Sequence, residues 1–310
     1  MQQISDAGAP TAVTVVVPTR DRPAQLEACL HSLRVTLRDD DELVVVDSAS
    51  IAGADVAAVA TRYGARLVRC DLPGVGRARN AGWRSARHDI VLFTDDDVVV
   101  EVGWRDALAA AVAAHPEAGF VTGRVLPSPG QVPSRDVAIK REDVVEVFDA
   151  TSVGNLGHSA NLGMRRGVLD KVGGFDEALG AGSRFKSAPE TDLFDRCFAA
   201  GLAGRYEPAA LAWHDQWRGP RRLLLLEARY GFGNGARIAK LVRTDRVRAR
   251  LVRHDALVGW GVQDVRREVQ ARHGYPAIGA LVRLVATFGG YARARLVPVV
   301  DGHFKPRPGR

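Results

Sequence analysis

The sequence predicts an α/β fold, in which a mostly parallel central sheet lies between two layers of helices and an Arg-rich helical extension follows. Short apolar runs alternate with amphipathic stretches between residues 12 and 125, which is typical of βα units. Each run is continuously apolar, as is usual for strands buried on both faces of a parallel sheet. Charge also divides the chain: residues 1–217 carry 23 Lys+Arg and 30 Asp+Glu, whereas residues 218–310 carry 20 and 6, a net charge of +14.

The regular elements are predicted mainly from apolar periodicity. Strands are expected over residues 12–17, 42–46, 65–70, 89–94, 119–125 and 204–214. Helices are expected over residues 23–37, 54–63, 77–86, 104–115 and 190–200. Pro23 opens the first helix at a position where its missing N–H costs nothing. The buried stripe of that helix is formed by Leu26, Leu30, Leu33 and Leu37.

The remaining segments are less regular. Residues 126–160 are rich in Pro and Gly and predict a loop-rich connection, and residues 161–178 predict a compact segment. From Arg221 onward the pattern is helical and Arg-rich. Near its end one apolar stripe, with Arg283, Arg293 and Arg295 nearby, is formed by Ile278, Leu281, Val282, Val285 and Phe288.

Composition excludes several classes of protein. No run of 18 apolar residues exists, so no membrane-spanning helix is expected. Cys29, Cys70 and Cys197 are too few and too widely spaced for a disulfide framework or a Cys-type zinc site, which favours a reducing compartment. Residues 1–10 lack an apolar core and predict a loose leader rather than a signal peptide. A cytoplasmic protein is expected.

Polar residues follow three of the predicted strands. Ligands of open α/β sheets bind beyond the carboxyl ends of the strands, so these residues are candidates for a site. They are Pro18, Thr19 and Arg20 after the first strand, Asp47 after the second, and Asp95, Asp96 and Asp97 after the fourth. Adjacent carboxylates repel one another, and a divalent cation such as Mg²⁺ or Mn²⁺ would relieve that repulsion. The alternative is a solvated acidic turn.

Two further groups are candidates for chemistry. His214 follows the last predicted strand, and imidazole beside a carboxylate suits Mn²⁺, although a lone His is more often structural. Glu190 and Asp192 lie in the first turn of the helix after Pro189. Acids at this position complement the helix dipole, and either one is also a candidate general base.

A glycine-rich loop enters the third predicted helix. Gly74, Gly76 and Arg79 could present backbone N–H groups and a guanidinium to phosphate. The spacing is not that of the dinucleotide-binding fingerprint, and no Walker A motif is present. Both absences weigh against a nicotinamide enzyme and a P-loop NTPase.

In order along the chain, these motifs resemble the family 2 inverting glycosyltransferases, which have the GT-A fold, a Rossmann-like α/β/α sandwich. The resemblance covers residues 13–214. The acidic triplet matches the metal-binding DxD motif. The other matching segments are residues 15–22 (VVVPTRDR), 44–50 (VVVDSAS), 76–82 (GRARNAG), 172–177 (VGGFDE, after Asn161) and 190–193 (ETDL).

The resemblance implies a role for each motif. Residues implied to contact the nucleotide sugar are Pro18, Thr19, Arg20, Arg22, Asp47, Ser48, Gly76, Arg79, Asn80, Asp95 and Asp96. Those implied on the acceptor side are Asn161, Gly174, Phe175 and Asp176. The cation, Mn²⁺ or Mg²⁺, is assigned to Asp95, Asp97 and His214.

Two departures from the family pattern matter. Ser48 stands where many members carry a second Asp after Asp47. In the base motif, Glu190 occupies the expected Asp position and Pro189 replaces the preceding Glu. Whether Glu190 or Asp192 is the base is therefore left open.

The implied reaction is a single displacement from a nucleoside diphosphate sugar, with UDP-sugar the expected donor. The implied organisation is a GT-A domain at residues 11–217, with a nucleotide-sugar half at 11–125 and an acceptor half at 126–217. A basic helical region follows at 218–310. The excess of 38 Arg over 5 Lys predicts a bacterial source.

Several alternatives remain at this stage. The basic region could contact an anionic membrane surface and a lipid-linked acceptor, or simply pack on the enzyme or on a second subunit. It lacks the interleaved exposed aromatics of a nucleic-acid binder, so nucleic acid is not expected as a partner. A non-catalytic nucleotide-sugar-binding protein is the other alternative. The acceptor and the oligomeric state stay open.

Overall fold

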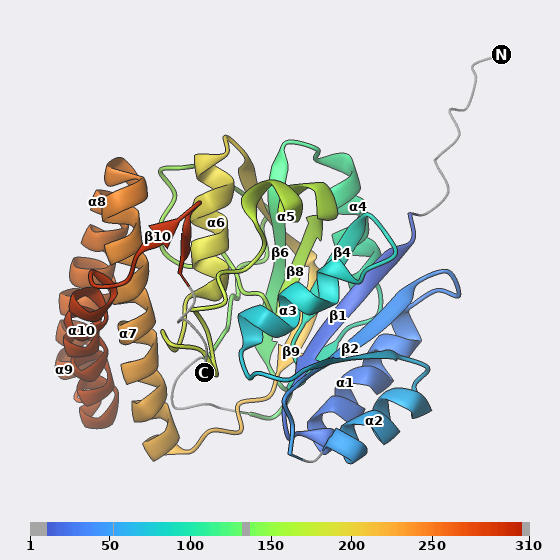
Figure 1. Cartoon of the computed structure of the whole chain (residues 1–310). Coiled ribbons are helices and arrows are strands. Elements are labelled where there is room, and N and C mark those ends of the chain that lie inside the picture. Colours follow the sequence, from blue (N-terminus) through green and yellow to red (C-terminus); the bar gives the residue numbers. More distant parts are fainter. Residues whose placement is uncertain (1–10, 52, 132–136, 306–310) are drawn as a thin grey trace.

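A computed structural model describes residues 11–51, 53–131 and 137–305 of the chain. Within these residues, nine strands form one sheet with helices on both faces, and a group of helices stands at one end beside α6 (Pro189–Ala199) (Figure 1). The predicted α/β class, the mostly parallel central sheet and the helical C-terminal extension are thereby confirmed. The predicted loose leader at residues 1–10 and residues 132–136 of the predicted loop lie outside the described part.

The first half of the sheet is parallel and follows the sequence pattern closely. Its strand order is β3-β2-β1-β4, and Val16 of β1 pairs with Val44 of β2 and Phe93 of β4. The strands are β1 (Val13–Thr19), β2 (Glu42–Ser48), β3 (Arg66–Cys70) and β4 (Ile90–Thr94). The helices between them are α1 (Pro23–Thr36), α2 (Gly53–Arg62) and α3 (Val75–Arg84). All four strands therefore end at the same edge.

The second half contains short strands that were not predicted. Residues 161–178, expected only as a compact segment, divide into β8 (Asn161–Arg165) and α5 (Arg166–Val172). β8 is antiparallel to both β4 and β6, and it joins the two halves of the sheet. The other elements of this half are β5 (Val98–Val100), α4 (Trp104–Ala114), β6 (Ala118–Pro127), β7 (Glu146–Phe148) and β9 (Ala203–His214).

Alternate residues of the buried strands fill two cores. Val15 and Val17 of β1 belong to a core that also contains the leucines of α1 and residues of α4, whereas Val16 belongs to a second core, on the other face, with Trp83 of α3 and residues of α6. Because the strands are buried on both faces, their sequences are continuously apolar rather than alternating.

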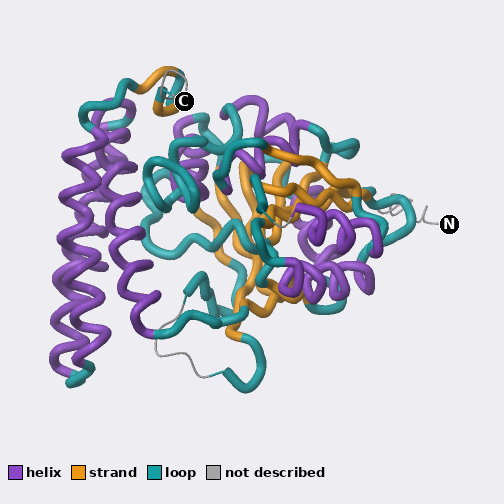
Figure 2. The backbone as a smooth tube through the Cα atoms, turned by 60° about the horizontal axis from the view of Figure 1, so that its bottom comes forward, coloured by secondary structure: helices purple, strands orange, loops and turns teal. Residues whose placement is uncertain are grey.

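The C-terminal region is a helical hairpin attached to the sheet domain (Figure 2). Its elements are α7 (Pro220–Thr244), α8 (Arg246–His254), a π-helical segment η1 (Asp255–Gln263), α9 (Asp264–Gln270), α10 (Gly274–Ala294), β10 (Val299–Val300) and β11 (His303–Phe304). Lys240 of α7 reaches into the sheet domain, where its Nζ lies 2.7 Å from Asp176 Oδ2 and 2.5 Å from Asp192 Oδ1. Among the described helices, none has the length and apolar content needed to cross a bilayer.

Candidate active site

The first part of the site is the acidic triplet at the end of β4. Asp95 Oδ1 accepts a hydrogen bond of 2.6 Å from Arg79 Nη2, and the Arg79 side chain is buried. The guanidinium of Arg79 lies 5.5 Å from the centre of the Phe175 ring, which in turn packs edge-on against Phe93. Phe175 therefore holds Arg79 in place against Asp95. Phe175, which the resemblance placed on the acceptor side, contacts Arg79 and Phe93, and its acceptor-side role stays a prediction.

The other two carboxylates are tied to the end of β1. Thr19 Oγ1 donates to Asp96 Oδ2 at 2.8 Å, and Arg22 Nη1 donates to Asp96 Oδ1 at 3.0 Å and to Asp97 Oδ2 at 3.2 Å. Asp96 and Asp97 are both buried. The sequence pattern predicted that Thr19, Arg22 and the triplet lie at one edge of the sheet. In the structure they are in direct contact there.

The two buried carboxylates differ in proton affinity. Burial and the neighbouring charge of Asp97 raise the pKa of Asp96 to about 6, against the smaller opposing effect of Arg22. Burial alone would also raise the pKa of Asp97, but the His214 and Trp217 hydrogen bonds and the charges nearby hold it well below its usual range. The hydrogen-bond donors around Asp97 thus stabilise its charged form, whereas Asp96 stays buried beside a second negative charge.

The end of β9 supplies the donors around Asp97. His214 Nε2 lies 3.4 Å from Asp97 Oδ1, Trp217 Nε1 donates to Asp97 Oδ2 at 3.0 Å, and Arg218 Nη2 lies 3.6 Å from the same oxygen. The backbone N–H of Asp215 also donates to the Asp97 carbonyl at 3.0 Å. The predicted pairing of His214 with the triplet is therefore present for Asp97.

The proton on His214 is fixed by its neighbour Gln216. The Gln216 amide donates through Nε2 to the carbonyl of Val137 and accepts through Oε1 from its N–H, which sets the amide orientation. The same Nε2 lies 2.7 Å from His214 Nδ1, so Nδ1 accepts and Nε2 carries the ring proton toward Asp97. In this arrangement His214 donates to Asp97, and it can ligate a cation only after that proton leaves.

The residue types at this edge suit a divalent cation, but their side chains do not point to one common position. Carboxylate oxygens and an imidazole nitrogen are suitable ligands for Mn²⁺, and burial together with the charge of Asp97 raises the pKa of Asp96. Asp95, however, is turned to Arg79. Within residues 11–51, 53–131 and 137–305, no group of three or more His, Cys, Asp or Glu side chains is arranged to hold a metal ion. The predicted metal ligands Asp95, Asp97 and His214 stay a prediction.

The end of β2 forms the far wall of the site. Asp47 is buried, and its carboxylate accepts from the Ser50 N–H at 2.9 Å and pairs with Arg69 of β3. Ser48 Oγ accepts from the Gly74 N–H at 3.1 Å, which fixes the glycine-rich loop to this strand end. Arg20 is exposed at the rim beside Asp21. Arg69 was not among the predicted site residues.

The structure separates the two candidate bases on α6. Asp192 is buried, and its oxygens lie 2.5 Å from Lys240 Nζ and 3.1 Å from Arg196 Nη2. Glu190 is half-buried; its own backbone N–H stabilises the carboxylate, and no ion pair of its side chain is found within the described residues. Burial raises the pKa of Glu190, the charge of Asp95 adds to this, and Arg79 partly offsets it, so Glu190 lies within electrostatic reach of the acidic triplet.

Three of the predicted site residues have their polar atoms occupied elsewhere. The Asn80 amide bonds to both the N–H and the carbonyl of Phe175 at 2.8 Å. The Asn161 amide accepts from Trp104 Nε1 at 2.8 Å and donates to the carbonyls of Arg124 and Ala210. Asp176 pairs with Lys240, as described above. These residues hold elements together around the site.

Two glycines assigned to the site allow α3 to approach the segment after α5. A Cβ on Gly174, whose φ is +67°, would lie 2.6 Å from Asn80 Oδ1. A Cβ on Gly76 would lie 3.1 Å from the Asp176 carbonyl. Both positions therefore serve close packing between the two halves of the domain.

The structure thus brings the acidic triplet and the ends of β1, β2 and β9 together at one edge of the sheet, and comparison with known proteins identifies the family. The model of the family described as glycosyl transferase family 2 matches residues 14–173, more than half of the chain. The chain belongs to glycosyl transferase family 2. This membership classes it as a glycosyltransferase.

Curated relatives carry the same kind of name. The chain is 28% identical over 303 residues to the pre-mycofactocin glycosyltransferase of Mycobacterium tuberculosis, covering 91% of this chain and 57% of that protein. It is 27% identical over 212 residues to the PGL/p-HBAD biosynthesis glycosyltransferase of Mycobacterium bovis, covering 66% of this chain and 77% of that protein. The chain therefore spans a little over half the length of the first of these relatives.

Solved structures confirm the GT-A fold. The mannosyltransferase PcManGT from Pyrobaculum calidifontis, in complex with GDP-Man and Mn²⁺, matches with a TM-score of 0.64 at 19% identity, covering 92% of this chain and 88% of that one. Residues 1–349 of Staphylococcus aureus TarS, in complex with UDP-GlcNAc, match with a TM-score of 0.52 at 15% identity, covering 94% and 95%. At these identities the likeness concerns the fold.

Several residues near the triplet were missed by sequence reasoning. Trp217 and Arg218 lie three and four residues after His214, and an aromatic and a cation just beyond a strand end were the signal that could have found them. Tyr230 of α7 has its pKa raised by burial, against the charge of Arg218, and it also senses the charge of Glu190. Its place in a helical region gave no sequence signal, because only the packing of α7 brings it there.

Proposed function

We propose that the chain catalyses an inverting transfer of a sugar from a nucleoside diphosphate sugar to an acceptor, with the help of Mn²⁺ or Mg²⁺. The observation that carries the proposal is the uncommitted carboxylate of Glu190 beside the acidic triplet. A half-buried acid with no ion pair among the described residues, whose pKa burial raises, is suited to accept a proton.

The donor is proposed to bind along the edge formed by β1, β2 and β4. Asp47 with Arg69 would meet the base and ribose end, and Arg22 and Arg218 would carry positive charge toward the diphosphate. UDP-sugar, expected from the resemblance, is the first donor to test. GDP-sugar is the natural comparison, because the matched structures hold GDP-Man in one case and UDP-GlcNAc in the other.

The cation would be held by Asp97 and His214, with Asp95 adjacent on the same strand end. When bound, it supplies positive charge that stabilises the departing nucleoside diphosphate. The chain's own residues prepare for it, since Arg22 and Thr19 hold Asp96 and Trp217 holds Asp97 in place. For His214 to ligate through Nε2, the ring proton would have to move to Nδ1, with the Gln216 amide turned to accept it.

Glu190 is proposed as the general base. Its carboxylate would accept the acceptor hydroxyl proton while the hydroxyl oxygen attacks the anomeric carbon from the face opposite the nucleotide. The C–O bond to the diphosphate breaks as the new glycosidic bond forms, and the anomeric configuration inverts. Asp192 is the less suitable base, because both of its oxygens are already paired with Lys240 and Arg196.

A non-catalytic nucleotide-sugar-binding protein is the second candidate. It would need the donor edge but no free base, so the unpaired Glu190 favours the enzyme. The two are separated by incubating the chain with UDP- and GDP-sugars in Mn²⁺ or in EDTA and measuring release of nucleoside diphosphate. The proposal expects release with Mn²⁺ that is lost in EDTA and in Glu190→Gln. Donor binding without release by the parent chain, across an acceptor panel, would support the non-catalytic reading.

A further inference from the structure

The outer face of α10 carries an apolar stripe that no described element covers. Ile278, Leu281, Val285 and Phe288 follow one another at helical spacing, and each side chain is exposed by between 51 and 63%. On the opposite face Arg283 is buried, so it does not lie beside the stripe as the sequence suggested. Its guanidinium pairs instead with Glu227 and Asp264. These four exposed residues are called the α10 face below.

The α10 face cannot turn inward, because the packing of α10 on α7 fixes its orientation. A Cβ on Gly235 would lie 2.0 Å from the Thr287 carbonyl oxygen, and one on Gly290 would lie 1.9 Å from the Phe232 carbonyl oxygen. The two backbones are therefore in direct contact, which no larger residue would permit. The ion pairs of Arg283 hold the same orientation from below.

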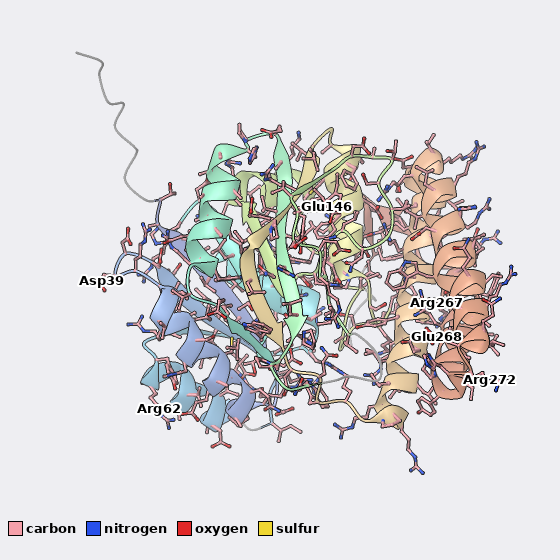
Figure 3. All side chains as sticks on the ribbon, turned by 180° about the vertical axis from the view of Figure 1, so that it is seen from behind. Asp39, Arg62, Glu146, Arg267, Glu268 and Arg272 are labelled. Atoms are coloured by element: carbon pink, nitrogen blue, oxygen red, sulfur yellow. The ribbon has the colours of Figure 1, made fainter. Side chains whose placement is uncertain are left out.

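Positive charge borders the α10 face at both ends. Arg272 precedes the helix and is exposed, next to His273, which contacts Glu268, and Arg293 and Arg295 lie exposed at the end of the helix. Residues 274–300 contain no Asp or Glu. Figure 3 shows Arg272 at the outer edge of the helical region, pointing away from the sheet domain. An apolar stripe between arginines matches the boundary of an anionic lipid layer, where phosphates lie above acyl chains.

We propose that the α10 face docks on the surface of an anionic bilayer. This goes beyond the proposed function and does not depend on it. A second copy of the chain fits less well, because it would bring together two regions that each carry a net charge of +14. A bilayer with anionic headgroups offers the opposite charge at the ends and an apolar layer between them.

The position of the α10 face relative to the site gives the docking a consequence. Tyr275, at the start of α10, lines an open hollow of about 600 Å³ together with Trp217, Gly219, Pro220, Arg221 and Arg222. Trp217 is the residue that donates to Asp97. A chain docked through α10 would thus hold this hollow near the lipid surface, with Trp217 linking it to Asp97. Under the proposed function, a lipid-linked anionic acceptor would lie there.

The test is flotation of the full chain with vesicles of equal parts phosphatidylglycerol and phosphatidylcholine, against pure phosphatidylcholine. The proposal expects flotation with the anionic vesicles only, reduced as NaCl rises from about 0.1 M to about 0.5 M. The double variant V285E/F288E should weaken it by about tenfold or more, since it places charge in the apolar layer. Val35→Glu, equally exposed on α1 away from the stripe, is the matched control and should float like the parent.

Other outcomes would overturn the proposal. Failure of the parent to float, or equal flotation of the parent and V285E/F288E, would show that α10 does not dock on lipid. Sedimentation velocity tests whether a second copy of the chain binds the α10 face instead. If the parent does not float and forms a dimer that V285E/F288E dissociates, the α10 face would be assigned to self-association. Thermal unfolding of each variant is the folding control. Because the substituted side chains are exposed, we expect each variant to unfold at the same temperature as the parent.

Discussion

Two groups of buried acids in the sheet domain meet their counter-charges in different ways. On α6, Asp195 Oδ2 lies 2.6 Å from Arg237 Nε, its Oδ1 lies 2.9 Å from Arg248 Nε, and Asp192 is held by Lys240. At the end of β4, three consecutive aspartates share their cations, and the pKa of Asp96 is raised to about 6 by burial and by Asp97.

The difference separates structural acids from functional ones. The acids of α6 bind cations of α7 and α8 and so attach the C-terminal helices to the sheet domain. A buried pair of this kind is costly to break from one side only, because the other charge is left unpaired. The acids of β4 are crowded at a ligand-binding edge, where strained charge is typical of an active site. Glu190 lies on α6, but we place it in the second group, because no ion pair of its side chain is found in the described part of the chain.

The largest effect on activity is expected from removing a charge from the acidic triplet. Asp97→Asn should lower the rate of nucleoside diphosphate release by about 10³-fold, because stabilisation of a developing charge is lost. The variant should also lose some stability, since His214, Trp217, Arg22 and Arg218 all face this carboxylate. Steady-state rates below the unfolding temperature, with folding checked by circular dichroism, measure it. Activity equal to the parent's would refute the assignment of Asp97.

The two acids of the α6 first turn should then respond in opposite ways. Glu190→Gln should lower the rate by about 10²-fold or more, since a general base is lost, with an unchanged unfolding temperature. Asp192→Asn should leave the rate much less affected and lower stability, because Lys240 loses one of its two carboxylates. Rates and thermal unfolding of both variants decide the question. A reversed pattern would make Asp192 the base.

The attachment of the helical region can be tested at Lys240. Lys240→Met should lower the free energy of unfolding by about 3 kcal/mol, because Asp176 and Asp192 stay buried with one fewer cation. The change should be measured by urea unfolding. Lys305→Met changes an exposed lysine, so it is a matched control and should have little effect. A Lys240→Met loss no larger than the control's would show that the ion pairs do not hold the two regions together.

A smaller effect is expected at His158, which faces the site from the loop before β8. Burial lowers its pKa to about 4, with a hydrogen-bond contact to the Ile139 carbonyl opposing. The unfolded chain takes up this proton near pH 6.5 and the folded chain does not, so stability falls as the pH drops from about 6.5 to about 4. In His158→Gln, the decrease in the free energy of unfolding between these pH values should be smaller by about 1–2 kcal/mol. Unfolding curves of both proteins at pH 7 and pH 4.5 would test it, and parallel losses would contradict it.

Much of this organisation could be predicted from local sequence. The apolar runs of β1, β2 and β4 mark buried parallel strands, and parallel strands end at one edge, so the joining of Thr19, Asp47 and the triplet followed from the pattern. β8 could not be predicted, because Asn161 and Gly163 interrupt the β-branched character that marks a strand. Its place in the sheet depends on pairing with distant strands.

Only those features of the site that depend on neighbouring residues in the sequence could be predicted. The choice between Glu190 and Asp192 depends on Lys240, which lies far along the chain on α7. The same holds for Arg283, whose sequence neighbours are apolar but whose partners Glu227 and Asp264 lie on other helices. Tertiary ion pairs of this kind leave no periodic signal in the sequence.

The central claim is that the β4 triplet and the edge around it form a metal-assisted nucleotide-sugar site. Calorimetric titration of the chain with UDP and GDP, with and without Mn²⁺, tests it most directly. The account predicts binding of one nucleotide that strengthens in Mn²⁺, and loss of that strengthening in Asp97→Asn. No binding of either nucleotide in either condition, or a Mn²⁺ effect that survives in Asp97→Asn, would contradict it.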